Sequence, residues 1–221
     1  EQAARVRDQL ALLKEQASGP IGFEAHNISV AAFDQVGAGL SMERADGMIE
    51  SLRVIKEPEE LACLEKACAL NHRLMEWAPG VLVPGRTERQ AAWDIEQFFR
   101  NHGAEGLSFA SIVAVDGNAA LPHAEPGDAL ITDNCGVLVD VGCRLDRYCS
   151  DQTRTFWVGG KPDAQFARDL DLIKEAQARA IALIRPGAAA ADVYAAARNH
   201  LEAHGVADLF THGLGHGIGL Q

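Results

Sequence analysis

Two aspartates in the middle of the chain are the residues best placed to carry chemistry. Asp140 lies in the apolar run Gly136–Gly142, and Asp151 lies just before the β-branched and aromatic run Gln152–Phe156. A carboxylate within an apolar strand is costly unless it is paired or bound to a metal ion. If the two runs form a hairpin that turns at Leu145 and Asp146, the two aspartates face each other with Cβ atoms about 5 Å apart. Carboxylates at that distance repel each other without a cation between them, so the pair predicts a metal site.

Each aspartate taken alone has a second interpretation. Asp151 is also suited to cap a turn or to pair with Arg154, and Asp140 is also suited to end its strand before Gly142. These structural roles remain alternatives for each aspartate considered separately. They do not explain why two acidic residues should meet within one apolar hairpin.

The last segment of the chain, Thr211–Leu220, carries His212 and His216 among four glycines. Two histidines four apart on a helix resemble the zinc motif H-E-x-x-H, but residue 213 is glycine and the repeated glycines oppose a helix. In an extended chain both histidines lie on one face, and the glycines leave room for a substrate. A phosphate-binding glycine loop would need glycine at Ile218. A structural glycine-rich strand with incidental histidines is the remaining alternative.

His123 is the other histidine of interest, because it follows the turn-prone segment Asn118–Pro122 just before the strand of Asp140. The other five histidines lie in polar or helix-end contexts, where solvated or capping roles are expected. They are His26, His72, His102, His200 and His204.

The elements that must hold these residues are helices followed by strands. A first helix is expected around Leu10, Leu12 and Leu13, and a short strand at Ile21–Phe23. Glu57-Pro58-Glu59-Glu60 predicts a helix start, and Thr87–Gln90 is a capping box that predicts a second helix running to Gly103. Strands are predicted at residues 112–115, 136–141 and 148–158. We expect a domain boundary near residue 54, which gives domains of residues 1–53 and 54–221.

A weak internal repeat also appears in the sequence. Pro84-Gly85 and His102-Gly103 flank the second predicted helix, and Pro186-Gly187 and His204-Gly205 recur after the same interval. Pro-Gly before a helix and glycine after it are common in proteins, so chance is the alternative explanation for the repeat. A true repeat would give two similar halves that enclose a central site.

Composition excludes several classes of function. The 31 acidic and 20 basic residues give a net charge of -11, so no basic face is expected to bind nucleic acid. The five cysteines form no C-x-x-C pair, which argues against a disulfide framework or a zinc ribbon. We expect a cytoplasmic protein without a signal peptide or membrane span.

Four motifs in this order resemble the metallopeptidase family of aminopeptidase P, prolidase and methionine aminopeptidase. They are Asn118–His123, Val139–Gly142, Ser150–Phe156 and His212–Gly217. The third is most similar to the Xaa-Pro branch. The resemblance implies an α+β pita-bread fold with pseudo-two-fold symmetry. Residues 1–53 resemble the last part of the α/β N-terminal domain of creatinase and prolidase. The family's usual glycine before Tyr148 is Arg147 here.

The resemblance also implies roles for individual residues. Asp140 would bind one metal ion, Asp151 would bridge two, and His216 would bind the other. His123 and His212 correspond to histidines that contact the substrate. The family completes its site with two glutamates and a histidine further downstream than Gln221. The chain therefore holds three of five expected ligands, and it is expected to be shortened at both ends.

The implied activity is hydrolysis of the Xaa-Pro bond of a small peptide by a hydroxide that bridges two divalent metal ions. Mn²⁺ suits these harder ligands, with Co²⁺ and Zn²⁺ as alternatives. A homodimer is expected, with no nucleic-acid or membrane partner. The rival interpretations are a creatinase-like or lyase-like enzyme on the same fold and a non-catalytic binding protein.

Overall fold

The computed structural model describes residue 12, residues 15–16 and residues 18–220. The chain divides into two compact units, Glu1–Glu57 and Pro58–Gln221. The first helix expected around Leu10, Leu12 and Leu13 lies for the most part outside the described residues. Within the described part of the chain, no helix has the length and apolar character needed to cross a membrane.

The first unit alternates strands and helices. Its elements are β1 (Ile21–Phe23), α2 (Val30–Gly37), β2 (Met42–Arg44) and α3 (Met48–Val54). β1 and β2 pair in parallel, which requires a crossover such as α2 between them. Phe23 and Phe33 join the strand to the helix, with ring centroids 4.7 Å apart. The strand predicted at Ile21–Phe23 is confirmed.

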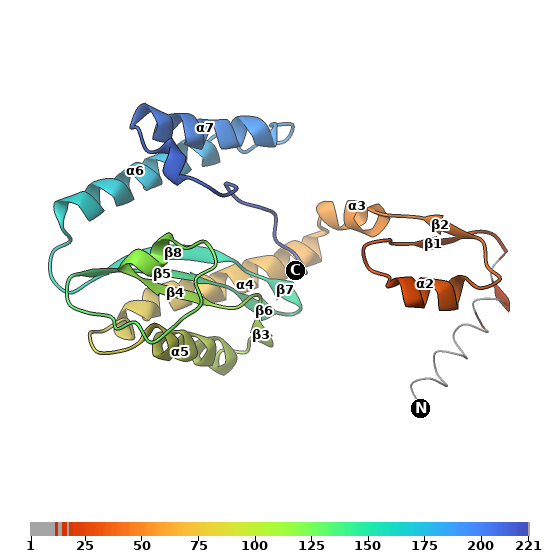
Figure 1. Ribbon diagram of the computed structural model, residues 1–221, viewed down its shortest axis with the longest axis horizontal. Helices are drawn as coiled ribbons and strands as arrows, with labels where there is room; N and C mark the ends of the chain where they lie inside the picture. The colour runs from red at the N-terminus through yellow and green to blue at the C-terminus, as the bar shows by residue number, and fades with distance from the viewer. Residues whose placement is uncertain (1–11, 13–14, 17, 221) are drawn as a thin grey trace. The chain divides into compact units, whose positions relative to one another are not determined.

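The second unit consists of two helices, a set of antiparallel strands and two further helices (Figure 1). Its helical elements are α4 (Pro58–Trp77), η1 (Ala78–Gly80), α5 (Glu88–Asn101), η2 (Asp116–Ala120), α6 (Ala164–Ile181), α7 (Ala190–Ala203) and η3 (Ala207–Leu209). Its strands are β3 (Gly106–Leu107), β4 (Ile112–Val115), β5 (Cys135–Val141), β6 (Cys143–Leu145), β7 (Tyr148–Cys149) and β8 (Gln152–Val158).

Both predicted helix starts are confirmed. α4 begins at Pro58, where a missing N–H costs nothing, and the acidic residues of its first turn lie at the positive end of the helix dipole. α5 begins with the capping box. The Gln90 N–H donates to Oγ1 of Thr87 at 3.1 Å, and the Thr87 N–H donates to Oε1 of Gln90 at 3.0 Å. Local sequence therefore determines where the two helices that cover the sheet begin.

The strands form two antiparallel sheets, with orders β4-β5-β8 and β3-β6-β7. Gly142 separates β5 from β6, and Ser150 and Asp151 separate β7 from β8. The hairpin that turns between β6 and β7 therefore leaves the β3-β6-β7 sheet and enters the β4-β5-β8 sheet at Gly142 on one strand and at Ser150 and Asp151 on the other. The single strand predicted at residues 148–158 is therefore wrong. At the level of this break the backbone at Gly142 approaches Ser150 so closely that no side chain fits between them.

β5 shows the alternation that places Asp140. Its odd-numbered residues are buried, and its even-numbered residues are partly exposed. Val137 and Val139 pack in a core with Leu74 of α4 and with Ile95 and Phe99 of α5. Because side chains alternate along a strand, Asp140 lies on the face away from this core.

A second, smaller core joins α6 to α7 through Ala176, Ala180, Ala197 and Leu201. His200 also lies on the buried face of α7, with its Nε2 3.4 Å from Glu175. The solvated or capping role expected for His200 is therefore wrong. His200 is buried because it lies on the face of α7 that packs against α6, and its polar neighbours in the sequence do not reveal this position.

The internal repeat is visible in the local structure. α5 and α7 occupy equivalent positions in the two copies, and each ends at a histidine whose Nδ1 lies close to a carbonyl oxygen one turn earlier. The distances are 2.7 Å for His102 and Phe98, and 2.9 Å for His204 and His200. The flanking glycines all have positive φ angles, +88° and +96° for Gly85 and Gly103, and +82° and +73° for Gly187 and Gly205.

Candidate metal centre

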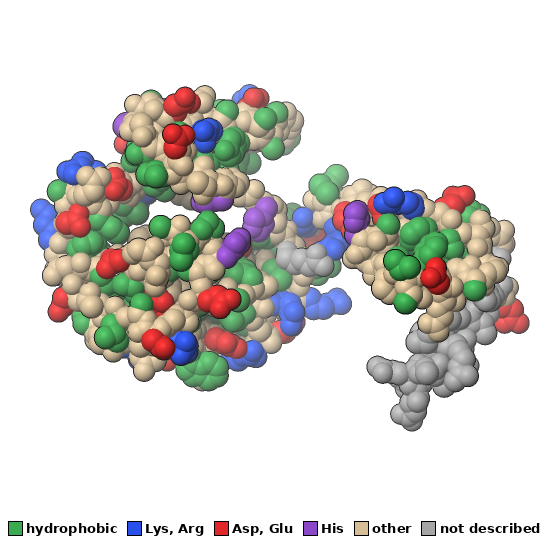
Figure 2. Space-filling view, in the orientation of Figure 1, with side chains coloured by type: hydrophobic (Ala, Val, Ile, Leu, Met, Phe, Trp, Pro, Cys, Tyr) green, Lys and Arg blue, Asp and Glu red, His purple; other side chains and the backbone are tan. Residues whose placement is uncertain are grey.

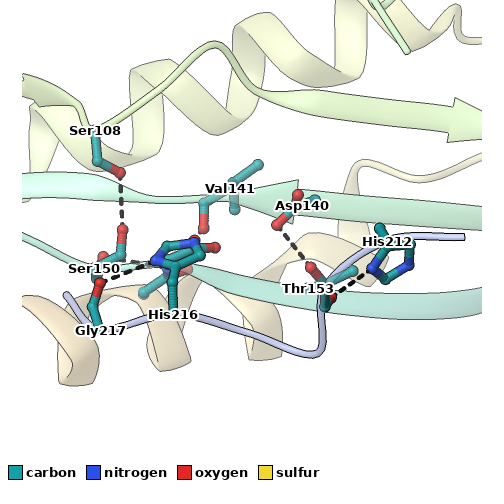
Figure 3. Close-up of polar contacts among 11 residues, drawn as sticks. Ser108, Asp140, Val141, Ser150, Thr153, His212, His216 and Gly217 are labelled. Atoms are coloured by element: carbon teal, nitrogen blue, oxygen red, sulfur yellow. Dashed lines mark hydrogen bonds and ion pairs between the residues drawn. The ribbon is translucent and has the colours of Figure 1, made fainter. Parts of the chain in front are cut away.

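Asp140 faces Thr153 across the central ladder. The two residues are directly opposite in the β5–β8 register, and the Thr153 hydroxyl donates to Oδ1 of Asp140 at 2.7 Å (Figure 3). The bond fixes one carboxylate oxygen. The Asp140 carboxylate also interacts with the carboxylate of Asp151.

The register expected from the sequence, with Asp140 directly opposite Asp151, is wrong. The turn consists of Asp146 and Arg147, with φ angles of +50° and +69°, and lies one residue later than expected. Two-residue hairpin loops favour this conformation because its twist matches that of the strands. The pairing partner of Asp140 therefore shifts by two residues to Thr153, a shift that preserves the face.

Asp151 lies where the chain passes from β7 to β8, and its side chain is 30% exposed. Partial burial is the main cause of its raised pKa, and the negative charge of Asp140 is the next largest. The charge of His216 acts in the opposite direction. The carboxylates of Asp140 and Asp151 therefore interact electrostatically, although the two residues are not directly opposite each other in the β5–β8 ladder. A cation would relieve the repulsion between them.

His216 reaches Asp151 from a distant part of the sequence. Its Nε2 lies 3.2 Å from Oδ2 of Asp151, and its Nδ1 lies 2.9 Å from the carbonyl oxygen of Gly217. Because a carbonyl oxygen only accepts, the Nδ1 side of the ring is the donor and Nε2 is directed at the carboxylate. The segment is attached to the hairpin by the Cys149 N–H, which donates to the Gly219 carbonyl at 2.7 Å. This orientation is the one that metal-binding histidines use.

Among the described residues, the other two candidate histidines, His123 and His212, make no hydrogen bond or ion pair with these residues. His212 lies on the same segment as His216, and its Nδ1 is 2.8 Å from the Gly213 carbonyl (Figure 3). Its ring packs edge-on against Phe210, with centroids 4.9 Å apart. His123 lies in an exposed turn, and within the described part of the chain no contact joins it to Asp140, Asp151 or His216. The space-filling view shows histidine side chains gathered on one face of the second unit (Figure 2).

The structure thus associates Asp151 with Asp140 and with His216. Across residues 12, 15–16 and 18–220, no group of three or more His, Cys, Asp or Glu side chains is arranged closely enough to hold a metal ion.

A set of polar side chains next to the site, Asn71, Ser108 and Ser150, was not predicted from the sequence. Asn71 of α4 is 1% exposed, and its amide donates to the Val141 carbonyl at 2.8 Å and to the Ser150 hydroxyl at 3.2 Å. The Ser108 hydroxyl donates to the Ser150 carbonyl at 2.8 Å. These bonds hold the residues next to Asp140 and Asp151. The available signal was the position of Asn71 on the apolar face of α4, one turn after Ala67 and one turn before Leu74.

Comparison with known proteins identifies the family of the chain. A model of metallopeptidase family M24 matches residues 62–221. An uncharacterised peptidase of Staphylococcus aureus is 34% identical over 212 residues, which are 95% of this chain and 60% of that protein. One of Staphylococcus saprophyticus is 39% identical over 176 residues, which are 80% of this chain and 50% of that protein. The chain therefore spans about half to three-fifths of the length of these relatives.

Solved structures give the same result for the fold. An Xaa-Pro dipeptidase from Bacillus anthracis has a TM-score of 0.92 and 29% identity over 97% of this chain and 61% of that one. A prolidase from Pyrococcus furiosus has a TM-score of 0.89 and 30% identity over 97% and 63% of the two chains. An X-Pro aminopeptidase from Thermotoga maritima has a TM-score of 0.90 and 26% identity over 96% and 61%.

Proposed function

Because the chain belongs to metallopeptidase family M24 and has its α+β pita-bread fold, we propose that the parent protein is an Xaa-Pro peptidase. Its reaction would be hydrolysis of the bond before proline, in dipeptides or at the N-terminus of longer peptides. The solved dipeptidase, prolidase and X-Pro aminopeptidase support this specificity. A small peptide with proline in second position is the proposed substrate.

The observation that carries this proposal is the position of Asp151 beside both Asp140 and His216. Asp140 raises the pKa of Asp151 through its charge, and Nε2 of His216 lies 3.2 Å from Asp151 on its other side. Two carboxylates and one imidazole form a donor set that suits divalent metal ions such as Mn²⁺, with Co²⁺ and Zn²⁺ as alternatives. The donor chemistry of these three residues therefore fits the metal ions that the family implies, although the described residues do not draw them together into a group of three around one point.

In this proposal Asp140, Asp151 and His216 would hold two divalent metal ions, with Asp140 and His216 each a ligand to one ion and Asp151 shared between them. Divalent ions at such a site lower the pKa of bound water and polarise a carbonyl group. Thr153 orients Asp140 through its hydroxyl, and the Gly217 carbonyl orients the ring of His216. Asn71 and Ser108 hold the backbone at Ser150, next to Asp151.

We assign substrate contacts to His123 and His212. Both side chains are exposed, and His212 belongs to the segment that carries His216. Imidazole N–H groups that reach a peptide carbonyl can stabilise the charge that develops on its oxygen. These roles rest on the motifs Asn118–His123 and His212–Gly217.

We assign residues 1–53 to the last part of an N-terminal domain and residues 54–221 to the catalytic domain. The match to prolidase covers 97% of the chain and so includes part of the first unit, which supports this assignment. Manganese as the physiological metal, a homodimeric assembly and a cytoplasmic location stay predictions.

The direct test replaces Asp151 in the full-length protein. We expect Asp151→Asn to abolish cleavage of an Xaa-Pro peptide and to weaken Mn²⁺ binding in calorimetry, with cooperative unfolding preserved. Asp146→Asn is the matched control, because Asp146 lies at the turn of the same hairpin with its side chain 53% exposed. Full turnover by Asp151→Asn would refute the role of this residue.

The same experiment separates the rival functions. A full-length protein that binds no divalent metal would exclude the metallopeptidase and favour a metal-free creatinase-like or lyase-like enzyme. A protein that binds metal but cleaves no Xaa-Pro peptide would favour another reaction or a binding role.

A further inference from the structure

Glu88, the first residue of α5, is a charged side chain in the interior of the second unit. It is 1% exposed, although glutamate is almost never fully buried without partners. Burial of an unpaired carboxylate is costly, so its position requires compensating bonds. The sequence pattern identified Glu88 only as part of the capping box and gave no reason for its burial.

Three donors surround the Glu88 carboxylate. Oε1 accepts from the Val115 N–H at 2.8 Å and from the Asn118 amide at 2.9 Å, and Oε2 accepts from the Gly127 N–H at 2.9 Å. The carboxylate also lies at the positive end of α5, where the helix dipole favours a negative charge. Both oxygens are therefore occupied by bonds to a single stretch of chain.

That stretch carries His123. Val115 and Asn118 precede the histidine and Gly127 follows it, so the carboxylate connects the two ends of the loop between β4 and residue 127. The Arg89 N–H adds a 3.0 Å bond to the Gly127 carbonyl on the same side. The exposed His123 side chain makes no hydrogen bond, ion pair or ring contact within the described part of the chain, so the backbone of this loop determines its position.

We propose that Glu88 is a positioning residue for His123: it fixes both ends of the loop so that the histidine is held ready for the substrate. The proposal rests on the substrate-contacting role given to His123 under the proposed function. Glu88 itself touches neither the substrate nor the metal ligands.

A double-mutant cycle in the full-length, metal-loaded protein tests the coupling. Glu88→Gln places an amide N–H₂ where a carboxylate oxygen had accepted a bond, so a donor then faces a donor at one end of the loop. We expect kcat/KM for an Xaa-Pro peptide to fall about tenfold or more, as small misplacements of catalytic groups do. In a His123→Ala background the same change should cost less than about twofold, because residues that act through one another are not additive.

Matched variants exclude a general effect on α5 or on the site. Glu96→Gln makes the same chemical change on α5, where Glu96 pairs with Arg100 on the surface, and should leave kcat/KM unchanged. Glu88→Gln should remain additive with His212→Ala, since His212 lies on another segment. If Glu88→Gln does not fold, Asn118→Ala removes only one of the three bonds and replaces it in the cycle.

Amide hydrogen exchange of the metal-free protein provides a readout that does not depend on activity. Glu88→Gln should accelerate exchange in residues 116–127 and leave the strands at residues 135–158 unchanged. Equal effects of Glu88→Gln in the wild-type and His123→Ala backgrounds, or unchanged exchange in the loop, would overturn the proposal. If His123→Ala has full activity while Asp151→Asn has none, the role of His123 is wrong, and with it the proposal. If neither change affects activity, the proposed function itself fails.

Discussion

The hydroxyl of Thr153 donates a 2.7 Å hydrogen bond to Oδ1 of Asp140 from directly across the β5–β8 ladder. This contact connects the hairpin register to the chemistry of the site, because a shift of register would remove the hydroxyl from the carboxylate. The β5 strand presents Asp140, and the β8 strand determines how its carboxylate is oriented.

The first prediction concerns that hydroxyl. Thr153→Val keeps the shape of the side chain and removes the donor, so we expect Mn²⁺ affinity in the full-length protein to fall about tenfold, as losses of ligand-orienting bonds do. Isothermal titration calorimetry measures the change. Thr155→Val is the control, because Thr155 lies opposite Leu138 on the same face of β8. Equal Mn²⁺ affinities for the two variants would contradict this role of Thr153.

The second prediction concerns Gly142, at the point where the hairpin changes sheets. A Cβ there would overlap the Ser150 carbonyl oxygen and the Ser108 hydroxyl oxygen. We expect Gly142→Ala to lower the free energy of unfolding by about 3 kcal/mol or more, at the upper end of overpacking effects, because one contacting atom belongs to the backbone. Urea denaturation measures the loss. Gly80→Ala, where a Cβ meets nothing within 4 Å, should change stability little, and similar results for the two variants would refute this explanation.

The third prediction concerns the left-handed residue of the turn. Arg147 has a φ angle of +69°, which costs a non-glycine residue roughly 1 kcal/mol. Arg147→Gly creates the favoured Asp-Gly turn and keeps the backbone N–H that donates to Glu105 at 3.0 Å. We therefore expect stability to be equal or higher, by up to about 1 kcal/mol. Arg147→Val should be the least stable of the three proteins, and a valine variant as stable as the glycine variant would show that the turn is not left-handed.

The fourth prediction is a dependence of stability on pH at alkaline values. The Tyr148 hydroxyl donates to Oε1 of Glu60 at 2.7 Å, and this bond is the main cause of the raised pKa of Tyr148. A group whose pKa is raised on folding contributes stability below its ordinary pKa, about 10 for tyrosine, and loses that contribution as the pH rises through the folded value. The advantage of the wild type over Tyr148→Phe should be constant near pH 8 and shrink above about pH 10. Urea denaturation at the two pH values tests this, and an advantage that grows with pH would contradict it.

Features that depend on neighbouring residues were predictable from the sequence. The capping box at Thr87 and the proline at the start of α4 determine helix starts through bonds within one turn, and the structure confirms both. The alternation of β5 determines that Asp140 faces away from the core. Asp140 and Asp151 were also expected on one face, and a shift of the register by two residues preserves that relation.

The sequence alone did not determine how distant segments meet. The register of Asp140 with Thr153 depends on a turn whose residues adopt positive φ angles, and the apolar pattern is equally compatible with a pairing shifted by two residues. The burial of Glu88 depends on donors from the loop at residues 115–127. The contact between His216 and Asp151 joins residues far apart in the chain. Local periodicity determines which face a side chain occupies, whereas the tertiary structure determines which side chain it meets there, because that choice depends on backbone approaches and hydrogen bonds between segments that are not neighbours in the sequence.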